Sequence, residues 1–469
     1  MILNSHHMKR FTLFIAVLFI ALSVASAKAP KYVFYLIGDG MGINSVYGAE
    51  LLNAAKNGQK YPQPLTISTL PYRTFITTYS ANDLTTDSAA AGTALATGVK
   101  TKNSVVGRDA EGNDVENIVE SARKAGYGTA IVTTAGISHA TPASFFGHTA
   151  DRDDYEILNR QLIDGGADFF AGAGFNVRSR LRDGETPCSA WVGKAREKGW
   201  NVLVGKDEFE KAAQNPKTIC LAYEDKYDIP YAIQNPEVRL GDLYKAAVAN
   251  MMKYHKKGFF MMVEGSNIDH GGHENDVYAI LEEVNDFDSV VAQAVAFYKA
   301  HPDETLIVVT ADHETSGITL GTDYRKIHAE VLLNQKMAQV DLSKALITLA
   351  KTEKPGWEDA KAIISDALGL WKEVAVDYKE EYALREIFET TVARGKSSTE
   401  RTLYAANERL ASAAVSLLGK KAGIQLSRHA HTAAQVPLFA IGVGAEKIAQ
   451  CKDNTDIPKT IRKVARYTK

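Results

Sequence analysis

The sequence predicts an α/β fold, a three-layer sandwich in which helices cover both faces of a mostly parallel central sheet. Two observations lead to this prediction. Short apolar runs rich in β-branched and aromatic residues alternate along the chain with longer helical stretches, as they do where crossover helices join parallel strands. The chain is also long enough, at 469 residues, for one large α/β domain with an insertion or for two ordinary domains.

The N-terminus has the pattern of a secretory signal peptide. Lys9 and Arg10 precede an apolar run over residues 11–24, and an A-x-A cleavage site ends at Ala27. We therefore assign residues 1–27 to a signal peptide, in which the segment before Met8 could be an upstream extension of residues 1–7. The apolar run is shorter than the roughly 20 residues that span a bilayer. We expect an exported protein, periplasmic or secreted, with no membrane partner after signal removal.

Charge and cysteine content argue against several other classes of protein. A formal net charge of −2 argues against nucleic acid or an acidic membrane as a partner. The cysteines, Cys188, Cys220 and Cys451, are too few for a disulfide-built scaffold, and their spacing contains no C-x-x-C that would suit zinc. In an exported protein Cys188 could pair with Cys220.

Carboxylates stand at the end of the strand predicted over residues 32–37 and at the start of the helix predicted over residues 89–97. The strand over residues 32–37 leads into Asp39, which lies between glycines that let a backbone approach an ion or a phosphate. The helix over residues 89–97 follows Asp87 and Ser88, and its N-terminal N–H groups and dipole favour an anion. Ser88 is therefore a candidate nucleophile, provided that a base or a metal lowers the pKa of its hydroxyl. The alternative is that Asp87 and Ser88 only cap this helix.

A second helix and strand come next. The helix over residues 114–125, capped by Asp114, leads to the strand over residues 129–133. His139 and then Arg152, which stands between two aspartates, follow this strand. Arg152 could form a solvated ion pair, or it could bind phosphate through its bidentate fork.

Ligand-type residues follow two further strands. After the strand over residues 259–263, Asp269 and His273 are four residues apart, which places both on one face of a helical turn and suits joint ligation of zinc. The glycine pair between them leaves open a turn that enters the helix predicted over residues 274–300. After the strand over residues 306–310, Asp312 and His313 are adjacent, so both can reach one ion only if the strand has ended there.

The C-terminal part contains a long insertion and one more pair of histidines. Residues 327–426 have the pattern of successive helices, and we predict a helical insertion there between two parts of a catalytic domain, residues 28–326 and 427–469. An independent helical cap is the alternative. His429 and His431 precede a strand over residues 438–441, and we expect one to be a ligand and the other to be solvated. Residues 175–240 permit no assignment beyond surface or substrate-facing structure.

Together and in this order, these motifs resemble those of the alkaline phosphatase family. The resemblance rests on Gly38-Asp39-Gly40-Met41-Gly42, Thr86-Asp87-Ser88-Ala89, His139-Ala140-Thr141-Pro142, Glu264 to His273, Thr310-Ala311-Asp312-His313 and His431-Thr432. It covers roughly residues 31–325 and 427–445. It implies an exported alkaline phosphatase that hydrolyses small phosphate monoesters and that could be a homodimer.

The resemblance also implies a role for each motif residue. Ser88 would attack phosphorus and carry the phosphoryl group transiently, while Arg152 would clamp the phosphate. Two Zn²⁺ ions would be bound, one by Asp269, His273 and His431, the other by Asp39, Asp312 and His313. A third ion, Mg²⁺, would bind Asp39, Thr141 and Glu264. Asp87, His139 and His270 would lie next to these ligands and the substrate. Some other members of the family carry different residues at the positions of His139 and His270, and this difference bears on the identity of the third ion. Two zinc ions about 3.5–4 Å apart stabilise both the attacking and the leaving oxygen of an in-line displacement.

Three other functions fit part of this pattern. A phosphodiesterase or another hydrolase of the same superfamily would keep the metal site and change the groups around the substrate. A phosphate-binding protein without catalysis would need no nucleophile. A metal-free Ser-His-Asp hydrolase would need a G-x-S-x-G turn, which Ser88 lacks.

Overall fold

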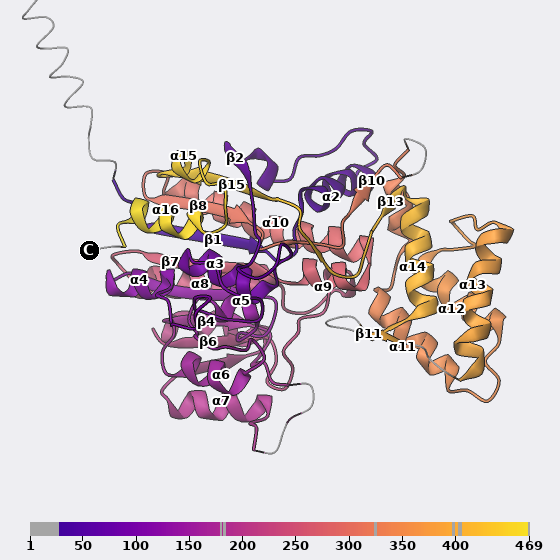
Figure 1. Cartoon of the computed structure of the whole chain (residues 1–469), viewed down its shortest axis with the longest axis horizontal. Coiled ribbons are helices and arrows are strands. Elements are labelled where there is room, and N and C mark those ends of the chain that lie inside the picture. Colours follow the sequence, from indigo (N-terminus) through magenta and orange to yellow (C-terminus); the bar gives the residue numbers. More distant parts are fainter. Residues whose placement is uncertain are drawn as a thin grey trace, which may run out of the picture.

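A nine-stranded sheet forms the centre of the computed structural model (Figure 1). The structure describes residues 28–178, 181, 184–322, 326–395, 399–401 and 406–467, so the predicted signal peptide lies outside the described residues. In spatial order the strands are β2 (Tyr72–Ile76), β15 (Val436–Gly442), β8 (Thr305–Thr310), β1 (Tyr32–Gly38), β7 (Phe259–Gly265), β3 (Gly128–Thr133), β4 (Phe169–Gly172), β6 (Thr218–Leu221) and β5 (Asn201–Val204).

The sheet is mostly parallel, as predicted. Within it β15 pairs antiparallel with both of its neighbours, β8 and β2, and the other neighbouring strands pair in parallel. The central strands β1, β7 and β8 are buried along their whole length, which explains their continuous apolar sequences, because a strand covered on both faces shows no alternation.

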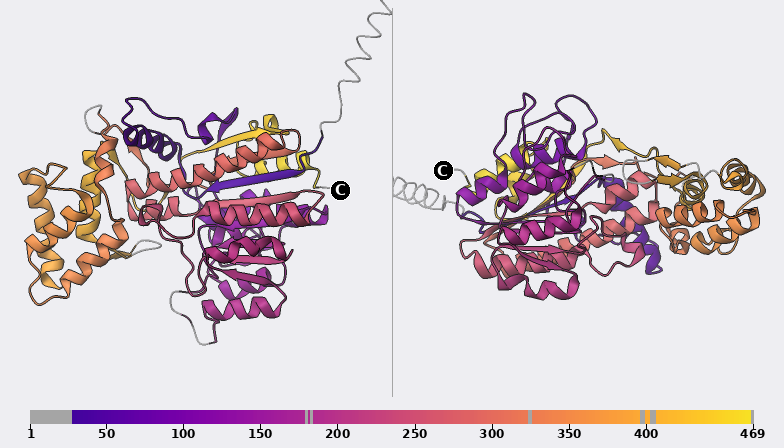
Figure 2. Two further views of the ribbon diagram at one scale, coloured as in Figure 1. Left: turned by 180° about the vertical axis from the view of Figure 1, so that it is seen from behind. Right: turned by 90° about the horizontal axis from the view of Figure 1, so that it is seen from below.

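Helices cover both faces of the sheet (Figure 2). One face is covered by α8 (Leu240–Tyr254) and α10 (Val277–Ala300). The other is covered by α4 (Ile118–Lys124) and α5 (Ala140–Ala143), with α3 (Ser88–Thr97) and α16 (Asp456–Ala465) packed beside them. The remaining helices of this part of the chain are α2 (Ile43–Lys56), α6 (Tyr155–Ile163), α7 (Cys188–Glu197), α9 (Asn267–Glu274), α15 (Ala445–Ile448), and the 3₁₀ helices η1 (Ile67–Thr69), η2 (Lys206–Gln214) and η3 (Ala232–Gln234). The three-layer prediction is thus confirmed.

Two predicted helices have different bounds in the structure. Helix α4 begins at Ile118 rather than Asp114, because Asn117 caps it in a reciprocal pair of hydrogen bonds with Glu120, while Asp114 pairs with Arg108 at 2.7 Å. The helix predicted over residues 274–300 starts later, since Asn275 adopts a left-handed backbone with φ of 56° and ends α9.

The sequence prediction missed four strands of the nine-stranded sheet, β2, β4, β5 and β6. Residues 175–240, left unassigned above, contain two of them, β5 and β6, at one edge of the sheet. The suggested pairing of Cys188 with Cys220 is wrong, because both thiols are free. Cys188 Sγ instead lies 3.3 Å from the carbonyl oxygen of Glu224.

The segment over residues 327–426 is largely helical and lies to one side of the sheet, at the right of Figure 1. Its elements are η4 (Ala329–Asn334), α11 (Gln339–Ala350), α12 (Trp357–Leu368), α13 (Tyr378–Thr390), η5 (Val392–Arg394), β11 (Thr399–Arg401), β12 (Ala406–Glu408) and α14 (Arg409–Lys421). The chain enters this segment after β10 (Thr319–Leu320) and returns to the sheet domain after β13 (Ile424–Gln425), and these two short strands pair with each other antiparallel. The carboxylate of Asp276, which caps α10, accepts hydrogen bonds from the Gln339 N–H (2.8 Å) and the Gln335 amide (2.9 Å) and so joins this segment to the sheet layer. None of the described helices combines the length and the apolar character needed to cross a membrane.

Candidate metal centre and nucleophile

The carboxyl ends of three neighbouring strands bring three carboxylates together. Asp39 follows β1, Glu264 lies near the end of β7, and Asp312 follows β8. The register aligns these ends, because Ile37 of β1 is opposite both Glu264 of β7 and Thr310 of β8. All three carboxylates are fully buried. Open α/β sheets bind their ligands at this edge.

Two further elements bring the predicted histidines to the same edge. Asp269 and His273 lie in the first and last turns of α9, so the helical reading of this pair is confirmed. His431 arrives on β14 (His431–Thr432), which pairs antiparallel with β9 (Glu314–Thr315) and sets His431 opposite Thr315. The imidazole of His431 stacks on that of His313, with ring centroids 3.6 Å apart.

Ligand-type atoms form three groups among the described residues, and within each group they lie within 4.8 Å of one another. The groups are Asp269, His273 and His431; Asp39, Asp312 and His313; and Asp39, His139 and Glu264. The first two are the sets expected for zinc. The third contains His139, whereas Thr141 was expected with Asp39 and Glu264; Thr141 is fully buried in α5, the helix that follows His139.

The histidines of the first two groups all present Nε2 to the centre. His273 Nε2 lies 3.1 Å from His431 Nε2, and His313 Nε2 lies 3.2 Å from an Asp312 oxygen. Each Nδ1 atom has a hydrogen-bond partner outside the centre. The partner is the His429 carbonyl for His273 (2.9 Å), the Thr86 carbonyl for His431 (2.8 Å) and the Thr315 hydroxyl for His313 (3.2 Å). Outer hydrogen bonds of this kind fix the tautomer and the orientation of metal-binding imidazoles.

The electrostatics of the carboxylates fit bound cations. Burial, reinforced by the neighbouring carboxylates, raises the pKa of Asp39 well above its ordinary value and raises those of Glu264 and Asp312 to about 7. Burial alone would also raise the pKa of Asp269, but the surrounding histidines, His273 first, hold it below its ordinary value. Burial lowers the pKa of His313, which favours the neutral imidazole that a metal requires.

Several oxygens of these carboxylates have no hydrogen-bond partner within the described part of the chain. They are both oxygens of Asp39, Oδ2 of Asp269, Oδ2 of Asp312 and Oε1 of Glu264. Buried polar atoms are nearly always satisfied in native proteins, and an unpaired buried carboxylate is costly. Divalent cations would satisfy these oxygens, so the residues fit the metal ions that the sequence led us to expect.

Ser88 lies beside the second group. Helix α3 begins at Ser88, with the Asp87 carboxylate accepting a hydrogen bond from the Ala90 N–H (2.9 Å) as its N-cap and Gly98 ending it at a φ of 83°. Ser88 is fully buried, and its Oγ is 3.2 Å from His313 Nε2. The nucleophile candidate and the ligand set are therefore in contact.

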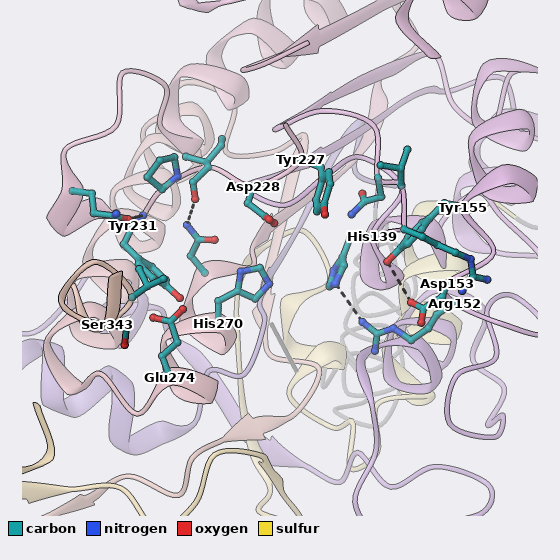
Figure 3. Close-up of a pocket in the computed structure, with 18 of the residues that line it drawn as sticks. His139, Arg152, Asp153, Tyr155, Tyr227, Asp228, Tyr231, His270, Glu274 and Ser343 are labelled. Carbon is teal, nitrogen blue, oxygen red and sulfur yellow. Dashed lines mark hydrogen bonds between the residues drawn. The ribbon is translucent and has the colours of Figure 1, made fainter. Parts of the chain in front are cut away.

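Arg152 is held at the N-cap of α3 by two of the other predicted residues. Its Nη1 is 3.2 Å from Asp87 Oδ2, and its Nη2 is 3.2 Å from His139 Nε2. All three residues line a cavity of about 1140 Å³ that also reaches His270 of α9 (Figure 3). His139 and His270 lie with ring centroids 6.0 Å apart. Burial, followed by the charge of Arg152, lowers the pKa of His139 well below its ordinary value.

Sequence reasoning missed two residues that hold the centre in place. The Thr315 hydroxyl donates to Asp269 Oδ1 and also lies 3.2 Å from His313 Nδ1. The His429 imidazole donates from Nδ1 to the His273 carbonyl at 3.0 Å, so this residue is part-buried rather than solvated. The only signal for either was its position two residues from a predicted ligand.

Comparisons with known proteins agree with one another. The family model described as alkaline phosphatase matches residues 30–170 and 161–467. Alkaline phosphatase 4 of Bacillus subtilis is 29% identical over 394 residues, which cover 82% of this chain and 77% of that protein. Alkaline phosphatase 3 of the same organism is 28% identical over 456 residues, covering 93% of this chain and 89% of that protein. The crystal structure of a cold-active alkaline phosphatase from Shewanella has the same fold, with a TM-score of 0.76, 24% identity, and coverage of 92% of this chain and 99% of that one.

Proposed function

The chain belongs to the alkaline phosphatase family, and from this premise we propose that it is an exported hydrolase of phosphate monoesters that works through a phosphoserine at Ser88. The observation that carries the proposal is the contact between Ser88 Oγ and His313 Nε2, 3.2 Å apart in a fully buried site. A serine hydroxyl needs activation to act as a nucleophile, and this contact places it at the edge of a ligand set.

The residues of the chain divide the reaction between them. Ser88 attacks phosphorus from the N-terminus of α3, where free backbone N–H groups and the helix dipole favour the phosphate oxygens. Arg152 binds two phosphate oxygens through its planar fork, and Asp87 and His139 hold that fork in place. Water then cleaves the phosphoserine and regenerates Ser88.

We propose that Asp269, His273 and His431 hold one Zn²⁺ and that Asp39, Asp312 and His313 hold another. Asp39, Glu264 and Thr141 would hold Mg²⁺, with His139 close enough to be a ligand as well. Bound zinc would lower the pKa of the serine hydroxyl and of water and would neutralise the charge of the leaving oxygen. The four carboxylates and the neutral imidazoles are the donor types that zinc and magnesium prefer.

The test compares hydrolysis of p-nitrophenyl phosphate by wild type and by Ser88→Ala, before and after chelation and zinc readdition. Wild type should lose turnover to the chelator and regain it with zinc, and Ser88→Ala should lose at least a thousandfold in kcat. Ser289→Ala is a matched control, because Ser289 is an exposed serine on α10 whose hydroxyl donates to the Asp286 carbonyl. Acid-quenched wild type should carry phosphate on Ser88.

Two outcomes would favour the alternative functions. Faster turnover of bis-p-nitrophenyl phosphate than of the monoester would indicate a phosphodiesterase. Binding of phosphate by the zinc-loaded protein without any release of nitrophenol would indicate a phosphate-binding protein.

A further inference from the structure

The cavity at Arg152 extends far beyond the space that a phosphoryl group needs. Its volume is about 1140 Å³, whereas pockets for drug-sized ligands span roughly 300–1,000 Å³. Beyond His270 it reaches the helical segment, where α11 lines it with Val340, Ser343, Lys344 and Ile347. These positions follow the i, i+3, i+4, i+7 pattern, so one face of α11 forms a wall of the cavity.

Aromatic rings form the part of the cavity nearest the reacting centre. Tyr155 and Tyr227 are both half-buried and line it together with Arg152. The Tyr155 hydroxyl donates to Asp153 at 3.3 Å, which fixes that ring. In Figure 3 Tyr227 lies between Tyr155 and Asp228, and Ser343 of α11 lies at the opposite side, beyond His270. Tyr227 and the α11 residues line the same cavity as Arg152, so a leaving group that extends from Arg152 into this cavity can contact them.

The two walls are tied to each other. The Gln234 amide of η3 donates to Asp341 of α11, and the Ala232 N–H of the same turn donates to Glu283 of α10. The segment that follows Tyr227 is thus fixed to both helices. Preorganised walls reduce the ordering cost of binding, so they can contribute to selectivity.

The charges in the far part of the cavity favour an uncharged group. Lys344 of α11 pairs there with Asp341 at 2.9 Å. Arg178, on the side of Tyr155, pairs with Glu185 at 3.1 Å. Asp228 and Glu274 also line the cavity. A second phosphate or carboxylate on the leaving group would have to compete with Asp341 for Lys344, or with Glu185 for Arg178. An apolar ring would instead contact Val340 and Ile347.

From these observations we infer that the cavity binds the leaving group and selects phosphomonoesters whose uncharged alcohol carries a planar aromatic ring, as nucleoside 5′-monophosphates do. The ring would stack on Tyr227 and contact the apolar residues of α11. This inference rests on the proposed function, since it concerns the substrate class of the same site. Tyr227, Val340 and Ile347 would be specificity-determining residues, with no part in the chemical step.

The test compares kcat/KM for adenosine 5′-monophosphate and ribose 5-phosphate in the zinc-loaded enzyme. Both esters release a primary alkoxide of ribose, so their ratio reports on the base alone. We expect the nucleotide to be preferred at least tenfold in wild type, the low end of what stacking of a base on an aromatic side chain contributes. Tyr227→Ala should lower kcat/KM for the nucleotide about tenfold more than that for ribose 5-phosphate, and Ile347→Ala should have a smaller effect in the same direction. Tyr227→Phe should keep the preference, because stacking does not require the hydroxyl.

A second measurement tests binding of the ring in a molecule that carries no phosphate. Adenosine, which lacks the phosphate, should inhibit hydrolysis of ribose 5-phosphate competitively, and its inhibition constant should rise in Tyr227→Ala. Tyr382→Ala is the matched control, because Tyr382 is an exposed tyrosine of α13 outside this cavity. The inference would be overturned if the ratio of kcat/KM for adenosine 5′-monophosphate to that for ribose 5-phosphate were near one in wild type. It would also be overturned if Tyr227→Ala left this ratio unchanged. Either result would leave the proposed function intact. Failure of the zinc-loaded enzyme to hydrolyse either of these esters or p-nitrophenyl phosphate would overturn the proposed function together with the inference.

Discussion

The outer hydrogen bonds of the histidines decide where their Nε2 atoms point. His273 and His429 are joined in both directions, since each imidazole Nδ1 donates to the other residue's carbonyl, at 2.9 and 3.0 Å. The side-chain amide of Asn275 lies 3.0 Å from His429 Nε2 and fixes the second side of that ring. His429 therefore acts as a positioning residue for a proposed zinc ligand.

This arrangement predicts that His429→Ala weakens zinc binding without removing a ligand. His429→Ala keeps the backbone carbonyl that accepts from His273 Nδ1 but removes the imidazole bonds that hold this carbonyl in place. Loss of an outer partner typically costs 10–100-fold in metal affinity, so we expect the zinc dissociation constant to rise by about 10-fold, the lower end of that range, in competition with a chromogenic chelator. His429→Asn should recover part of the affinity, because its amide can donate where Nδ1 did. His328→Ala is the control, as His328 is exposed and pairs only with Glu330 within the described structure. Equal zinc affinity in all four proteins would refute the positioning role.

Asp87 has two roles that different substitutions separate. Its carboxylate caps α3 through the Ala90 N–H and also holds Arg152. Asp87→Ala should lower the free energy of unfolding by about 1 kcal/mol, the usual cost of a lost N-cap, and should raise the inhibition constant of inorganic phosphate several-fold because Arg152 is less well oriented. Asp87→Asn should restore stability, since asparagine caps equally well. A loss of stability in the asparagine variant equal to that of Asp87→Ala would contradict the capping role. Urea unfolding and product inhibition measure the two effects.

At the scale of elements, the sequence predicted what is local and missed what depends on pairing. The apolar runs of β1, β3, β7, β8 and β15 identified those strands because burial on both faces requires continuous apolar sequence. The exposed edge strand β2 and the four-residue strands β4, β5 and β6 carry no such signal. The α9 spacing placed Asp269 with His273, but only the β9–β14 pairing brings His431 to them, and no periodicity reveals a two-residue strand.

The contact between η3 and α10 predicts a pH dependence of stability. Burial, with Asp286 adding to it, raises the pKa of Glu283 to about 8, while the Ala232 N–H and Arg239 act in the opposite direction. The folded protein therefore holds this proton more tightly than the unfolded chain, whose glutamate has a pKa of about 4.3. The stabilisation is fully present below the unfolded pKa and is lost as the pH rises through about 8.

Glu283→Gln should remove this pH-dependent contribution to the free energy of unfolding. Between pH 5 and 8.5 the free energy of unfolding of wild type should fall more steeply than that of the variant, by up to about 1.4 kcal/mol for each pH unit. The difference between the two proteins isolates Glu283 from other titrating groups. Glu210→Gln, at an exposed carboxylate of η2, is the control and should follow wild type. Parallel curves for wild type and Glu283→Gln would contradict the prediction.

At the scale of the whole molecule, the buried carboxylates link metal content to folding. Glu264 lies in β7 and Asp269 in α9, while Asp39 follows β1 and Asp312 follows β8. Each of these carboxylates is fully buried at the edge of the sheet. Without cations their mutual repulsion and desolvation oppose folding. Cations that bind only the folded chain stabilise it by mass action, by about 2.7 kcal/mol at a concentration 100 times the dissociation constant.

Removing the metal should therefore lower the midpoint of thermal unfolding by several degrees, and zinc with magnesium should restore it. Ser88→Ala leaves all of these carboxylates and histidines in place, so its zinc-loaded form should remain about as stable as zinc-loaded wild type although it is inactive. Asp312→Ala removes one ligand and one of the mutually repelling charges, so it should gain less stability from added zinc than wild type does. Calorimetry of the three proteins with and without metal measures these differences. If chelation left the midpoint of wild type unchanged, the buried carboxylates would have to be neutralised by protons, and the metal centre would be refuted at the level of the fold.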